Sequence, residues 1–221
     1  MNIALFNPLS VCHAVQPLSP QLKSSDLRSF TAQDLFDVAQ KLRSNQAVAV
    51  VDGIGFTKQE LYIKAITLDP NFSEPYYFLG CLLPSDGSVE LPKEGRVGKQ
   101  QLYLKSIQLN RRFARAYCEL AETLTEGRKI ELLKNIMMSQ SELYRIAIYL
   151  DCRLAKAYFN LGMIVGEGSS IELVNEGKIS GQALLLKARE LDHTFFKADH
   201  CLFYILSNPS VWLSRNSAPG T

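Results

Sequence analysis

The chain has 221 residues, of which 47% are apolar and 21% charged, a balance typical of a soluble folded protein. Its 24 basic and 22 acidic residues give a formal net charge of +2, which indicates neither a nucleic-acid partner nor an anionic membrane partner. No apolar run approaches the roughly 20 residues that a membrane-spanning helix needs.

The cysteines and the N-terminus bear on the compartment. Five cysteines, an odd number, form no C-x-x-C pair, which favours free thiols over a disulfide framework or a zinc site. No basic residue precedes Lys23, and Pro8 interrupts a short apolar stretch, so a secretory signal is not predicted. We therefore expect a cytoplasmic protein without a metal or other cofactor, with export through an unconventional leader left open.

Residues 1–30 form an irregular segment rich in Ser, Pro and Leu. Asn7–Pro8 and Ser19–Pro20 predict extended or turn backbone. We expect a repeat domain over residues 31–207, with about four repeats and a terminal helix, and a C-terminal tail over residues 208–221.

The repeat domain shows a period of 41 residues. One apolar pair returns at this interval (102 − 61 = 41) as Leu61–Tyr62, Leu102–Tyr103, Leu143–Tyr144 and Leu184–Leu185. A fixed period of this size predicts an elongated array of stacked units and not the compact core of an enzyme.

Each unit is predicted to begin with a helix that carries apolar residues at i, i+3, i+4 and i+7. The third of these is glycine or alanine, which lets a neighbouring helix approach closely. The inner helices carry Tyr76, Leu79, Gly80 and Leu83, then Tyr117, Leu120, Ala121 and Leu124, then Tyr158, Leu161, Gly162 and Val165. The pattern weakens in helices expected near residues 35–42 and 199–206, as in capping units.

A connector with an apolar–acidic–apolar triplet follows each inner helix: Val89–Glu90–Leu91, Ile130–Glu131–Leu132 and Ile171–Glu172–Leu173. Glycine-containing turns are present in three units, at Asp52–Gly53, Lys93–Glu94–Gly95 and Asn175–Glu176–Gly177. Apolar alternation around such a turn predicts a small β-hairpin. The third unit has Lys134–Asn135–Ile136 and no glycine, so we expect irregular or helical structure there.

The second helix of each unit has a clear start. Thr57, Gly98, Ser139 and Ser180 are equivalent by the 41-residue step. Thr57 with Glu60, and Ser139 with Glu142, have the spacing of capping boxes. Asp69–Pro70 is predicted to end the first of these helices.

Several of these motifs resemble tetratricopeptide (TPR) repeats. Leu68–Asp69–Pro70, the set Tyr76, Leu79 and Gly80, and the stretch "LYIKAITLDPNFSEPYYFLG" carry the likeness, which covers about residues 31–207. The chain departs from the family in its period, 41 against 34, and the extra residues lie between the two helices of a repeat. Sel1-like repeats are the second choice. The resemblance implies a mainly α fold, a right-handed α-solenoid of helix pairs with short β-hairpin-like connectors, whose first helices line a concave groove that often binds peptides.

The resemblance also places candidate partner-binding residues on the first helices. These are Phe36, Tyr77, Phe78, Arg115, Glu119, Lys156, Phe159, Asn160, Lys197, His200 and Tyr204. Arg115, Lys156 and Lys197 form a basic row, and with the aromatic side chains they suit an acidic or C-terminal peptide. The alternative is that the row is a solvated face and that the aromatic side chains pack between helices.

We therefore expect a protein–protein interaction scaffold that binds a peptide or helix of a partner, an acidic one being suited, with no nucleic-acid or membrane partner. The alternative is a structural, self-associating repeat protein that assembles through its terminal helix or its hairpins, because Phe195, Phe196 and Phe203 exceed what one buried face needs. Catalysis is not expected. His200 and Cys201 are adjacent on a helix, whereas a nucleophile and its base must meet.

Overall fold

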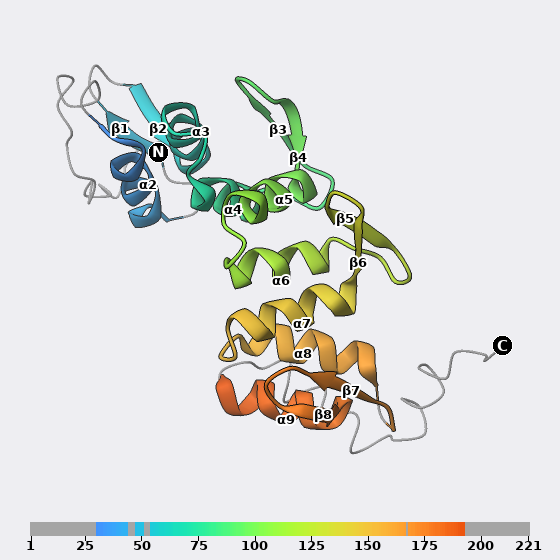
Figure 1. Ribbon diagram of the computed structural model, residues 1–221. Helices are drawn as coiled ribbons and strands as arrows, with labels where there is room; N and C mark the ends of the chain where they lie inside the picture. Colours follow the sequence, from blue (N-terminus) through green and yellow to red (C-terminus); the bar gives the residue numbers. More distant parts are fainter. Residues whose placement is uncertain (1–29, 44–46, 51–53, 167, 193–221) are drawn as a thin grey trace, which may run out of the picture.

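The computed structural model describes residues 30–43, 47–50, 54–166 and 168–192. Within them the chain is mainly helical, and small β-hairpins separate the helices (Figure 1). The mainly α fold with hairpin connectors predicted from the sequence is thus confirmed. The helix expected near residues 199–206, the segment 1–29 and the tail 208–221 lie outside the described residues.

The element boundaries follow the 41-residue period, since α3, α5, α7 and α9 begin at positions 58, 99, 140 and 181. The helices are α2 Ala32–Lys41, α3 Lys58–Leu68, α4 Ser73–Leu82, α5 Lys99–Leu109, α6 Ala114–Glu122, α7 Gln140–Leu150, α8 Ala155–Val165 and α9 Gly181–Leu191. The strands are β1 Ala47–Val50, β2 Ile54–Thr57, β3 Ser88–Leu91, β4 Gly95–Gly98, β5 Lys129–Leu133, β6 Ile136–Ser139, β7 Ser170–Leu173 and β8 Gly177–Ser180.

Helices pack mainly against their neighbours in the chain. The closest pairs are those that a hairpin joins, namely α2 with α3, α4 with α5, α6 with α7, and α8 with α9. The second helix of each pair also packs on the first helix of the next pair. Figure 1 shows the result as one elongated series of helices from which the hairpins project.

Tyrosine side chains fill the contacts between these helices. The largest fully buried side chains include Tyr62, Tyr76, Tyr103, Tyr144 and Tyr158. Burying one large apolar side chain contributes about 1.5–3 kcal/mol. The recurrence of tyrosine at equivalent positions therefore gives each helix pair a similar core.

Two glycines allow the close helix approach that the sequence predicts. A Cβ atom at Gly80 on α4 would lie 2.6 Å from Cε1 of Tyr103 on α5. A Cβ atom at Gly162 on α8 would lie 3.0 Å from the carbonyl oxygen of Gly181 on α9. Any larger side chain at Gly80 must displace a fully buried ring.

The predicted capping boxes form at the starts of α3 and α7. The Thr57 and Ser139 hydroxyls accept hydrogen bonds from the Glu60 and Glu142 amides, and each glutamate accepts one from the amide of its cap residue. Hydrogen bonds from Thr57 lower the pKa of Glu60. These interactions satisfy amide groups that a helix start otherwise leaves unpaired.

The second and fourth hairpins have the same turn. Leu91 pairs with Gly95 and Leu173 with Gly177, and both glycines have a positive φ, of 71° and 70°. A three-residue turn closed by a residue of positive φ is a common hairpin connection, and glycine adopts that φ without a steric cost.

The third hairpin corrects the expectation of helical structure in that unit. β5 and β6 pair there as well, with a register shift between Glu131 and Leu133. Ile136 stands where the second hairpin has Gly95 (136 − 95 = 41), and a β-branched residue disfavours positive φ. The positive φ, 68°, falls one residue earlier, on Asn135, a residue type that tolerates it. The irregularity was expected, whereas the helical alternative is wrong. The turn at Asp52–Gly53 lies outside the described residues.

Candidate functional site

The candidate residues that the structure describes lie on α2, α4, α6 and α8, and contacts connect them across units. The Phe36 ring on α2 lies 5.5 Å from the Phe78 ring on α4. Lys156 Nζ on α8 lies 2.7 Å from Glu119 Oε1 on α6. We call the side of the first helices that carries these residues the first-helix face. Lys197, His200 and Tyr204 lie outside the described residues.

The aromatic members of this face pack largely against one another. Tyr77 is only 7% exposed and Phe159 only 8%. The Tyr77 ring lies 4.9 Å from Phe78 and 4.8 Å from Phe113, measured between ring centroids. Phe36 and Phe78 are half-buried and offer more surface to a ligand than Tyr77 does.

Lys156 is held by acidic side chains of the neighbouring helix. Its ammonium group lies 2.7 Å from Glu119 Oε1 and 2.9 Å from Glu122 Oε1, and Asn160 donates a hydrogen bond to Glu122 over 2.8 Å. Burial opposes the charge of Lys156, but the hydrogen bonds to both glutamates outweigh it and raise the pKa of Lys156. Lys156 thus links α6 to α8, and its charge is already compensated.

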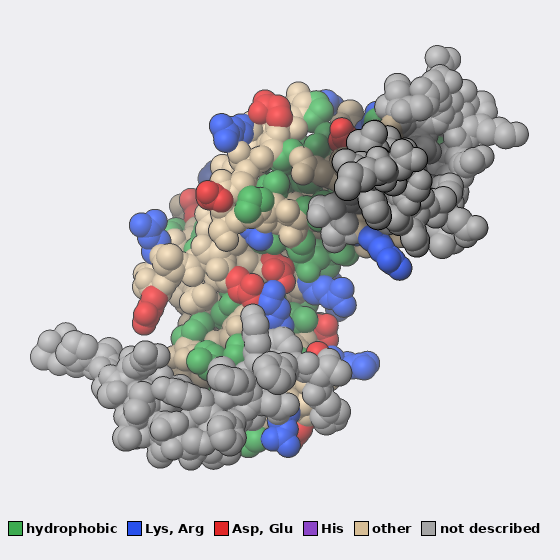
Figure 2. All heavy atoms as spheres, turned by 180° about the vertical axis from the view of Figure 1, so that it is seen from behind, with side chains coloured by type: hydrophobic (Ala, Val, Ile, Leu, Met, Phe, Trp, Pro, Cys, Tyr) green, Lys and Arg blue, Asp and Glu red, His purple; other side chains and the backbone are tan. Residues whose placement is uncertain are grey.

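Arg115 is the exposed cation of the first-helix face on α6. Burial raises the pKa of the Tyr77 phenol, and the charge of Arg115 acts in the opposite direction. In the view of Figure 2, acidic and basic side chains are interspersed and not sorted by sign. Of the predicted basic row, Arg115 is therefore the described member best placed to attract a ligand carboxylate.

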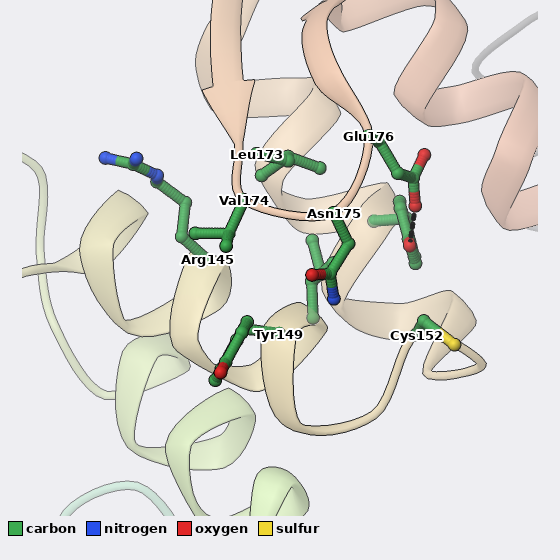
Figure 3. A pocket seen from close by; sticks show the side chains of 9 residues that line it. Arg145, Tyr149, Cys152, Leu173, Val174, Asn175 and Glu176 are labelled. Atoms are coloured by element: carbon green, nitrogen blue, oxygen red, sulfur yellow. Dashed lines mark hydrogen bonds between the residues drawn. The ribbon is translucent and has the colours of Figure 1, made fainter.

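The hairpin turns are anchored to first helices by a repeated hydrogen bond. Tyr76 donates to Glu94 over 3.2 Å, and Tyr158 donates to Glu176 two periods later (158 − 76 = 176 − 94). Figure 3 shows the second of these bonds beside a cavity of about 20 Å³ between α7 and the β7–β8 turn. A space of this size holds about one water molecule, so it is too small for an organic ligand.

A larger groove lies on the outer side of the third unit, and reasoning from the sequence missed it. Its volume is about 470 Å³, and it is lined by Met138, Glu142, Arg145, Ile146, Tyr149 and Val174. Two of its apolar side chains are strongly exposed, Tyr149 at 57% and Val174 at 77%. A comparison of equivalent positions between units would have revealed it, because Ile146 stands where the other units have lysine.

The three described cysteines are free thiols in different surroundings. Cys81, Cys118 and Cys152 form no disulfides, and burial raises the pKa of the Cys118 thiol to about 12. Among the described residues no group of three His, Cys, Asp or Glu side chains is arranged to hold a metal ion. Each described helix is too short or too polar to cross a lipid bilayer.

Comparison of the chain with models of known protein families gave no match, and comparison with curated proteins gave none either. The structure therefore defines a class by architecture alone: a mainly helical protein whose helix pairs are joined by short hairpins.

Proposed function

We propose that the protein is an interaction scaffold of the TPR-like, right-handed solenoid type, and that it binds a peptide or helix of a partner protein on the first-helix face. The observation that carries the proposal is the connection of equivalent helices by side chains, through Phe36 and Phe78 and through Glu119 and Lys156. A surface continuous over several units suits an extended or helical ligand.

The favoured ligand is an acidic segment that places a carboxylate at Arg115 and an apolar side chain near Phe78. Arginine binds carboxylates with two parallel hydrogen bonds, and half-buried aromatic rings are common anchors at interfaces. Lys156 is a poor candidate for contacting the ligand, because Glu119 and Glu122 already bind it. Reversing its charge would place a third carboxylate beside them, so any loss of binding would be confounded with a loss of stability.

The test uses displayed random peptides selected on the purified full-length chain. Synthetic versions of the selected peptides are then titrated against the wild type and Arg115→Glu by fluorescence anisotropy. We expect Arg115→Glu to weaken binding about tenfold or more, and added salt to weaken it too, because exposed charges are screened. Arg128→Glu reverses an exposed charge in the loop before β5 and serves as the matched control. The proposal is refuted if no selected peptide binds Arg115→Glu more weakly than it binds Arg128→Glu.

Self-association is a second candidate, favoured by the third hairpin. Ile136 and Met137 on β6 are exposed apolar residues, and each described hairpin forms its own two-stranded sheet. Unpaired strand edges can pair with another chain. Light scattering after size-exclusion chromatography should then show a dimer that Met137→Lys converts to a monomer, whereas a wild-type monomer would eliminate this candidate.

A further inference from the structure

The units provide an internal comparison for the outer groove. Position 146 holds isoleucine, where the equivalent positions hold Lys64, Lys105 and Lys187. Lys64 Nζ lies over the Phe56 ring at 4.6 Å from its centroid, and Lys105 Nζ lies 3.4 Å from Glu94 Oε1. In the units of Lys64 and Lys105, a lysine therefore covers the junction of helix and hairpin with a charge.

Two further positions change in the same unit. Tyr149 occupies the place of Thr67, Gln108 and Glu190. Met137, which is 51% exposed, occupies the place of Gly55, Arg96 and Lys178. Solvent-facing positions that are polar or small in three units are thus apolar in the third. A cluster of exposed apolar side chains of this kind marks an interaction site.

Ile146 and Tyr149 line a wide, open groove together with Met138 and Val174. Met138 comes from β6, Ile146 and Tyr149 come from α7, and Val174 comes from the turn of the next hairpin. In Figure 3, Val174 lies next to α7, while Arg145 and Tyr149 extend outward from that helix. Two consecutive units therefore form the walls, and the floor is the side of α7 on which the other units carry lysine.

The polar rim of the groove selects the charge of its ligand. Glu142 is committed to the start of α7, where its Oε2 accepts hydrogen bonds from the Ser139 amide at 2.7 Å and the Ser139 hydroxyl at 2.6 Å. Arg145 makes no hydrogen bond or close ion pair with any residue that the structure describes. Hydrogen bonds from Ser139 chiefly lower the pKa of Glu142, and the charge of Arg145 acts in the same direction. Its position is aliphatic in the other units, as Ile63, Leu104 and Leu186. The groove thus combines an apolar floor with a guanidinium whose hydrogen-bond donors have no partner among the described residues.

We propose that this groove is a second binding site, distinct from the first-helix face, for a short segment of another protein that carries apolar side chains and a carboxylate for Arg145. A second copy of this chain is a poorer fit. In a symmetric dimer the same surface meets itself, so two Arg145 side chains would face each other, and the acidic lining residue of each copy is held in its capping box.

The experiment selects displayed short random peptides on the full-length chain and counter-selects them on Ile146→Lys/Tyr149→Thr. Both replacements are residues that other units carry at these positions, so the fold should accommodate them, and circular dichroism checks this. We expect enriched peptides that combine apolar residues with Asp or Glu. The double variant and Arg145→Glu should each weaken their binding about tenfold or more.

The controls separate this site from the first-helix face. Arg145→Lys keeps the charge and should retain most of the affinity, and Arg115→Glu should leave the binding of these peptides unchanged. Peptides that bind the double variant as well as the wild type, or that lack acidic residues, would overturn the proposal. So would a wild-type dimer that the double variant dissociates, because a second copy would then occupy the groove.

Discussion

At the scale of single residues, equivalent positions of the units act as controls for one another. Ser106 on α5 illustrates this, because the equivalent positions hold Ala65, Ala147 and Ala188. Its hydroxyl is fully buried and has no hydrogen-bond partner among the residues described. A buried polar group without a partner lowers the stability of the fold.

Ser106→Ala is therefore expected to raise the free energy of unfolding by about 1 kcal/mol. Urea denaturation followed by circular dichroism measures this change. The matched control is Ser141→Ala on α7, where the serine is not fully buried and its loss should have a smaller effect. A decrease in stability for Ser106→Ala would mean that its hydroxyl has a partner after all.

At Gly80 a larger side chain is expected to lower stability, because the close contact between α4 and α5 leaves no space for one. Gly80→Leu should lower the free energy of unfolding by about 1–3 kcal/mol, since the added atoms collide with the buried Tyr103 ring. Thermal or urea unfolding gives the value. Leu82→Ala on the same helix removes atoms from a more exposed side chain and should cost less. An unchanged stability for Gly80→Leu would show that α4 and α5 do not approach closely.

At the scale of elements, the third hairpin shows which features of the fold can and cannot be predicted from sequence patterns. The capping boxes were predictable because they depend on residues three apart in the chain. The third hairpin was not predicted because its turn lacks glycine. Asn135 could have indicated the turn, because asparagine tolerates a positive φ. The joining of Lys156 to Glu119 was beyond such reasoning, since residues 37 apart meet only once α6 and α8 are packed.

The third turn gives a direct prediction. Asn135→Ala should lower the free energy of unfolding by about 1 kcal/mol, because alanine adopts positive φ at a cost that asparagine largely avoids. Asn135→Gly should preserve or raise stability, since glycine has no Cβ atom to clash. Urea unfolding of the two variants side by side tests the argument. Equal destabilisation by both would point instead to the loss of an Asn135 side-chain contact.

At the scale of the whole molecule, contact between sequence neighbours predicts an elongated particle. A compact protein of 221 residues has a radius of gyration of roughly 17 Å. Small-angle X-ray scattering of the monomer should give a clearly larger value, and circular dichroism should show a mainly helical spectrum with a minor β component. A radius near the compact value would mean that the helix series folds back on itself.

The equal spacing of α3, α5, α7 and α9 bears on how this chain can change in length. Removal of residues 99–139 would join Gly98 directly to Gln140, one period later. α7 would then meet α4 in place of α5, and Tyr144 would reach Gly80 where Tyr103 did, with Leu143 in the place of Leu102. Nearly the same residues meet at each junction between helices. A duplication or loss of one unit in the gene would therefore yield a longer or shorter protein with its interfaces preserved. A unit gained in this way could change its outer surface without loss of the core that its neighbours need, and the third unit carries such a different outer surface.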